Sequence, residues 1–177
     1  MPPTGRDLAE QLHWHWNAQL RPRLDGLTTD EYLWEPVRGM WSVRVEGDQV
    51  RLDWMSPMPV PAPVTTIAWR LCHVWMVLAQ RADYHFGTRT LTIDRMRWPA
   101  TAQAALAALD DAYANWWDRV NGLPDERFEQ PSAGPPGTLD GQFPFWAVVL
   151  HVNREVIHHG AEIAVFRDLY AASLSLA

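Results

Sequence analysis

The sequence contains no lysine, only one cysteine and no long uninterrupted run of apolar residues. All 15 cationic side chains are arginines, they form no basic stripe, and the net charge is −6, so no nucleic-acid partner is expected. Cys72 cannot form an intrachain disulfide, which fits a reducing cytoplasm. Because no stretch of about 18 uncharged apolar residues occurs and the N-terminus lacks a signal-peptide pattern, we expect a cytoplasmic protein without a membrane partner.

The composition is that of a folded protein with a sizeable core. Hydrophobic residues make up 47% of the 177 positions and charged residues 20%, which favours a globular chain over a disordered one. A chain of this length suits one domain, which we expect to span residues 1–177. Eleven tryptophans are many for this length, and most should lie in the core or line a pocket.

Apolar residues recur at helical spacing in four segments of the chain. This pattern predicts helices over about residues 4–24, 65–86, 101–120 and 143–172. The long connection at 25–64 should hold a short helical piece near 29–33, a hairpin over 43–52 and an extended proline-rich stretch at 56–63. A second irregular stretch is predicted at 131–141. The fold class is therefore an all-α four-helix bundle with a long first crossover that carries a small hairpin.

The last predicted helix contains a carboxylate and an imidazole on its apolar face. Glu155 and His159 are four residues apart and so project from the same side of a helix. That side is also the apolar stripe of the helix, where an uncompensated charge is costly. A divalent metal would compensate the carboxylate, and Glu and His are both ligands that such a metal accepts.

A catalytic metal site needs a third ligand from elsewhere, and His73 is the best candidate. It lies in the middle of the most apolar predicted helix, and bundle sites are commonly built from facing helices. His73, Glu155 and His159 would leave at least one position open for water or substrate, a pattern that suits zinc, nickel or ferrous iron. The alternative is structural: His73 is then a hydrogen-bonded core residue, and Glu155 pairs with an arginine such as Arg154.

Four further residues are candidates to line the pocket or to orient the ligands. His151 and Glu162 fall on the same helix face as Glu155. His158 points about 100° away from His159, so it should be solvated or a partner of a ligand. Trp69, on the helix of His73, is the fourth candidate.

The remaining histidines and the cysteine are assigned no chemistry. His13 and His15 flank the apolar stripe of the first helix, where we expect a structural role, with pocket lining as the alternative. His85 is expected at the surface, near a helix end. Cys72 cannot share a face with His73 and should be a small buried hydrophobe.

Three parts of the sequence carry a resemblance to a known family. They are TIAWRLCHV, which contains His73, the Trp41-Ser42 pair, and the closing segment HVNREVIHHGAEIAVFRDLY. Together they resemble the DinB-like superfamily, and most of all the branch that contains the metal-binding domain of mycothiol-dependent maleylpyruvate isomerase. The resemblance implies a four-helix bundle, a divalent metal held by His73, Glu155 and His159, and a possible homodimer.

The resemblance also implies an activity. Characterised relatives are transferases or isomerases that use a low-molecular-weight thiol such as mycothiol or bacillithiol. In these relatives the metal is expected to bind the thiol as a thiolate, which attacks a small electrophile. The isomerase has a second domain that this sequence lacks, so maleylpyruvate is not an expected substrate. Two alternatives stay open. One is a metal-assisted hydrolase, with Glu162, His151 or His158 as base. The other is a non-enzymatic metal-binding or stress-response bundle, which a fourth ligand such as His151 or His158 would favour.

Overall fold

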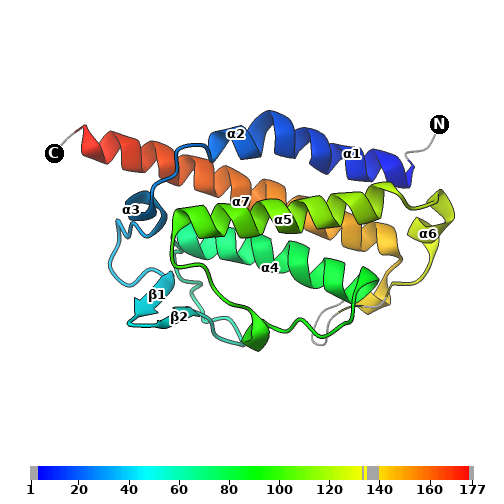
Figure 1. Ribbon diagram of the computed structural model, residues 1–177, viewed down its shortest axis with the longest axis horizontal. Coiled ribbons are helices and arrows are strands. Elements are labelled where there is room, and N and C mark those ends of the chain that lie inside the picture. Colours follow the sequence, from blue (N-terminus) through cyan, green and yellow to red (C-terminus); the bar gives the residue numbers. More distant parts are fainter. Residues whose placement is uncertain (1–3, 133, 135–139, 176–177) are drawn as a thin grey trace.

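The computed structural model describes residues 4–132, 134 and 140–175, which fold into an all-α bundle with one small hairpin (Figure 1). The predicted first helix is α1, which continues through a π-helical turn (η1) into the short α2. The other three predicted helices are confirmed as α4, α5 and α7. The bounds of these long segments are α1 (Gly5–His15), η1 (Trp16–Leu20), α2 (Arg21–Arg23), α4 (Ile67–Phe86), α5 (Ala102–Asn121) and α7 (Phe145–Leu174).

The helix boundaries follow from local chemistry. The side chains of Thr66 and Thr101 accept backbone N–H groups in the first turns of α4 and α5, as N-caps do. Gly87 follows the last residue of α4, as expected of a helix stop. The bundle therefore starts and stops its central helices at positions that the sequence marks clearly.

The connections contain the smaller elements. The short helical piece and the hairpin were both predicted, whereas a helix after α5 and two 3-10 turns were not. The predicted irregular stretch at 131–141 lies largely outside the described residues. The bounds of these elements are α3 (Thr29–Tyr32), β1 (Val43–Glu46), β2 (Gln49–Leu52), η2 (Ile93–Arg95), α6 (Asp125–Glu129) and η3 (Asp140–Gln142).

The four long helices occupy the corners of the bundle in the order α1, α5, α4, α7. Helix α1 packs on α5 and α7, and α4 packs on the same two helices, so α1 and α4 lie at opposite corners. Helices α4 and α7 run antiparallel: Arg70 near the start of α4 pairs with Glu162, and His85 near its end packs on Phe145. This antiparallel contact carries the candidate site.

Helices α4 and α5 run parallel, which the helix boundaries did not indicate. Phe86 at the end of α4 contacts Trp116 near the end of α5, and Figure 1 shows both helices running in one direction. The connection at 87–101 must therefore return along the length of the bundle. It is a second crossover, beside the one at 25–66.

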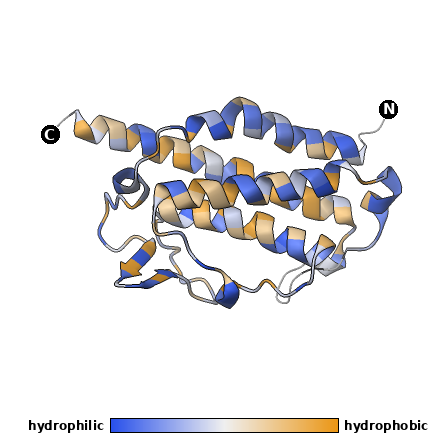
Figure 2. Cartoon of the chain, in the orientation of Figure 1, coloured by the Kyte–Doolittle hydropathy of each residue, from blue (hydrophilic) through white to orange (hydrophobic). Residues whose placement is uncertain are grey.

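The core fills the space between the four helices. Figure 2 shows apolar and polar residues alternating along each helix, as expected of helices that bury one face. Trp116 is buried, whereas Trp117 lies at the boundary of the core. Cys72 is fully buried, as predicted. None of the described helices is long and apolar enough to cross a membrane.

Candidate metal centre

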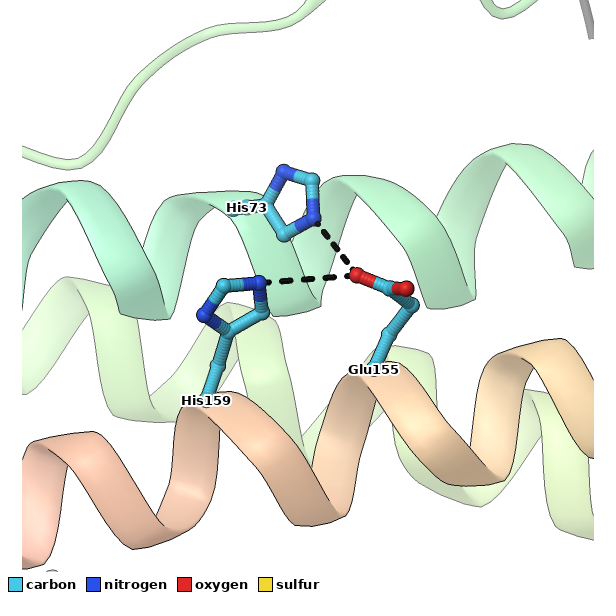
Figure 3. A group of neighbouring side chains, drawn as sticks. All are labelled: His73, Glu155 and His159. Carbon is cyan, nitrogen blue, oxygen red and sulfur yellow. Dashed lines mark hydrogen bonds and ion pairs between the residues drawn. The ribbon is translucent and has the colours of Figure 1, made fainter. Parts of the chain in front are cut away.

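Three side chains from two helices converge on one point in the bundle (Figure 3). His73 comes from α4, and Glu155 and His159 come from consecutive turns of α7. His73 Nε2 lies 3.1 Å from Glu155 Oε2, and His159 Nε2 lies 3.5 Å from the same oxygen. Ligand atoms placed about 2.0–2.1 Å from a tetrahedral cation are about 3.3 Å apart, so the spacing of these donors fits a single metal ion.

The two helices position these side chains in different ways. Glu155 and His159 share a face because four residues make about one turn. His73 reaches them only because α4 crosses α7 in the register that places its middle turn opposite Glu155. Its ring stacks on Trp69 with 5.2 Å between centroids, and the Trp69 indole N–H donates to the carbonyl of Asp53. The first crossover thus fixes the tryptophan that holds the His73 ring.

A second carboxylate holds the other imidazole. His159 Nδ1 lies 2.7 Å from Glu162 Oε2, and the Arg70 Nε donates to the same oxygen at 2.9 Å. Arg70 also donates to the carbonyl of Thr65 and covers the ring of Phe166. A carboxylate that holds the Nδ1 proton leaves Nε2, the nitrogen that faces Glu155, as the one that can bind a metal after it loses its own proton, and metal-binding histidines typically have such a partner.

The electrostatics of the cluster favour positive charge between its donors. Hydrogen bonds from His159 and His73 hold the pKa of Glu155 far below its usual range, although burial opposes them. Burial lowers the pKa of His159, but hydrogen bonds to Glu155 and Glu162 outweigh it and raise that pKa. The pKa of Glu162 is lowered: burial raises it, but hydrogen bonds from His159 and Arg70 prevail. The donors that hold protons here would bind a divalent cation by releasing them.

The structure keeps His151 and His158 outside the three-residue cluster. His151 Nδ1 lies 3.6 Å from the other oxygen of Glu155, and its Nε2 faces Arg81, so His151 lines the space beside the cluster. His158 is exposed, as predicted, and faces Glu162 at 3.7 Å. His158 and His159 could also share a cation with Glu162, but Arg70 already engages that carboxylate.

The prediction for His85 was wrong. This ring is half-buried, with its centroid 4.9 Å from that of Phe145. Burial, together with the charges of Arg127 and Arg81, lowers the pKa of His85 to about 4. The sequence placed His85 near a helix end, but the ring turns inward toward α7 rather than outward.

The other residues outside the centre are packed into the fold. His13 stacks on Trp117 and lies 2.7 Å from the Tyr113 hydroxyl, which is a structural role. His15 lies 2.9 Å from Gln19 on the same helix. Burial raises the pKa of Cys72 to about 12, so this thiol is not a nucleophile at neutral pH.

The cluster opens on a pocket of about 390 Å³. His73 and Glu155 lie at one side of it. Its walls come from the first crossover, from α4, from α7 and from the second crossover. Sequence reasoning missed the contribution of the second crossover because 87–101 has no helical periodicity. The lining residues outside the cluster are Trp54, Met76, Val77, Gln80, Arg81, Tyr84, Arg89, Leu91, Thr92, Ile93 and His151.

The family model of the DinB superfamily matches residues 11–163, so the chain belongs to this superfamily. Its domains commonly bind a divalent metal, and the cluster of two histidines and one glutamate is a suitable group of ligands. Comparisons with the curated proteins and with the solved structures returned no match. The family membership therefore rests on the family model.

Proposed function

We propose that this protein is a divalent-metal-dependent enzyme that adds a low-molecular-weight thiol, of the mycothiol type, to an electrophilic small molecule. His73, Glu155 and His159 are its metal ligands in this proposal. The single observation that carries it is the meeting of these three donors beside a pocket of about 390 Å³, which His73 and Glu155 line. Two imidazoles and one carboxylate suit zinc or nickel best, with ferrous iron as a further option.

The arrangement favours an enzyme over a structural metal site. Structural zinc sites use four protein ligands, whereas catalytic sites use three and keep a position open. Among the described residues, neither His151 nor His158 brings a nitrogen to the meeting point of the three donors. A pocket of this volume lies within the range of small-molecule sites, about 300–1,000 Å³.

In this proposal, the residues around the pocket have different roles in the reaction. When bound, the cation supplies the positive charge that keeps a coordinating thiol deprotonated near neutral pH. Glu162 holds His159 in one tautomer, Trp69 holds the His73 ring, and Trp54 covers the apolar side of the pocket. The thiol loses its proton to solvent, a sulfur–carbon bond forms, and the leaving group departs with its electron pair.

Elemental analysis of protein purified without a metal-affinity tag tests the ligand assignment. We expect about one equivalent of metal in the parent protein and almost none in His73→Ala, Glu155→Ala and His159→Ala. His158→Ala is the matched control, because it removes the neighbouring imidazole from the exposed side of the helix. Metal retained by all three variants, or absent from the folded parent, would contradict the assignment.

A conjugation assay tests the activity. The metal-loaded protein would be mixed with chlorodinitrobenzene, with and without mycothiol, and release of chloride would be followed. We expect release that needs both the thiol and the three ligands. Thiol-independent turnover of ester substrates would instead support the metal-assisted hydrolase. No turnover with any thiol or ester, in a protein that binds metal, would support the non-enzymatic bundle.

A further inference from the structure

The start of the second crossover is folded around one carboxylate. Asp83, in the last turn of α4, accepts the backbone N–H groups of Thr88, Thr90 and Leu91 at 3.0, 2.7 and 2.8 Å. Between them, Arg89 has a φ of 63°. This left-handed conformation is costly for a residue with a Cβ atom and persists where the surrounding structure imposes it. The loop therefore holds Arg89 in a set position.

The exposed side chain of Arg89 makes two contacts with Tyr84. Its Nε donates to the carbonyl of Tyr84 at 3.1 Å, and its guanidinium carbon lies 5.3 Å from the centroid of the Tyr84 ring. Among the described residues no carboxylate forms an ion pair with Arg89. The guanidinium retains N–H donors beyond the one that Tyr84 engages.

Arg89 lines the same pocket as the metal cluster. The side chains of Trp54, Met76 and Ile93 contribute an apolar surface to this pocket. The only carboxylate among the described lining residues is Glu155, and it is already engaged by two histidines. In a protein of net charge −6, the pocket thus combines a metal site, an apolar wall and a preorganised cation.

We propose that Arg89 binds the carboxylate of the electrophilic substrate and so selects apolar acceptors that carry one. A planar guanidinium pairs with a carboxylate through two parallel hydrogen bonds, and the contacts with Tyr84 lower the entropic cost of that pairing because they already restrain the side chain. The identity of the ligand as the thiol acceptor rests on the proposed function. The binding of the carboxylate does not, since Arg89 is not part of the metal cluster.

Calorimetric titration with two matched probes tests this proposal. One probe is 4-chloro-3-nitrobenzoate, and the other is its methyl ester, which has a similar ring and no charge. We expect the parent to bind the carboxylate about five- to tenfold more tightly than the ester, with metal or after chelation. Arg89→Asn should abolish this preference, because asparagine tolerates the left-handed backbone and removes the charge. Arg89→Lys should keep part of it.

The control is Arg119→Asn, which removes an exposed arginine of α5 that does not line this pocket. Arg119→Asn should bind both probes like the parent. A preference that survives Arg89→Asn would overturn the proposal. So would a preference that disappears with the metal, because the carboxylate would then bind to the cation itself. A preference that needs Arg89, in a protein without transferase activity, would support the carboxylate site and contradict the thiol transferase.

Discussion

Helix α4 has two half-buried histidines that face α7, one toward each end of the contact between these helices. His73 faces Glu155 and stacks on Trp69. His85, twelve residues later, packs against Phe145, and its Nε2 is buried without a hydrogen-bond partner among the described residues. The antiparallel register places a carboxylate opposite the first imidazole and an aromatic ring opposite the second.

The difference shows that the partner helix decides what a histidine does. Near His73, the pKa of Glu155 is held low and a positive charge between the donors is stabilised. Near His85, burial and neighbouring arginines lower the pKa of the imidazole to about 4, which favours the uncharged ring. One end of the interface is therefore suited to bind a cation and the other to pack a neutral ring.

Removal of the metal should have the largest effect on the stability of the protein. This effect should depend on the cluster that contains His73 and not on His85. A ligand present at about 100 to 1,000 times its dissociation constant stabilises a fold by about 3–4 kcal/mol. We expect a chelator to lower the melting temperature of the parent accordingly, and to leave that of His73→Ala unchanged. Calorimetric melting curves measure both. Equal melting curves for the parent with and without chelator would contradict a bound metal at the His73 cluster.

Loss of the hydrogen bond that orients His159 should have the next largest effect. Glu162→Gln weakens the hold on the Nδ1 proton and the pairing with Arg70. Partners of this kind commonly contribute about 10- to 100-fold to metal affinity, and we expect a loss in that range. Competition with a chromophoric chelator measures it.

The control for Glu162→Gln is Arg167→Met. Arg167 lies farther along α7, and its substitution breaks the ion pair with Glu31 of α3. Arg167→Met should lower the free energy of unfolding without changing metal affinity. If both variants lose affinity equally, Glu162 acts through general stability rather than through His159.

The lowered pKa of His85 should make the free energy of unfolding depend on pH. The pKa of His85 is lower in the folded protein than in the unfolded chain, so the unfolded chain binds more protons between pH 6.5 and 4. The free energy of unfolding should fall as the pH falls through this window, by about 1–2 kcal/mol since the ring is partly exposed. Urea unfolding of metal-free parent and His85→Phe at pH 7 and pH 5 measures the effect. A loss of the same size in His85→Phe would assign it to other groups.

The smallest effect is expected at Cys72, the immediate neighbour of His73 on α4. Its thiol is buried on the other side of the helix, 3.5 Å from the Tyr32 hydroxyl, and burial raises its pKa to about 12. Cys72→Ala should leave metal content and conjugation rate unchanged, with a modest loss of stability of about 1 kcal/mol. In the native protein iodoacetamide should not alkylate Cys72, as mass spectrometry would show. Rapid alkylation would contradict its burial.

Sequence reasoning could propose the candidate metal cluster because two of its three residues are close in the sequence. Glu155 and His159 follow from helical spacing alone, and His73 followed from its place in a very apolar helix together with the family resemblance. The role of Glu162 was open until Arg70 and His159 were seen on one oxygen atom. His85 was misplaced because its sequence position near a helix end says nothing about the direction of its ring.

The sequence by itself determined the helices, their caps and the shared face of Glu155 and His159, since these depend on interactions between residues a few positions apart. Only the tertiary structure decided the register of α4 against α7 and the parallel course of α4 and α5. Because α4 and α5 are parallel, residues 87–101 return along the bundle, and Arg89 lines the pocket. Such choices depend on side chains packing across long sequence separations, and local spacing carries no information about them.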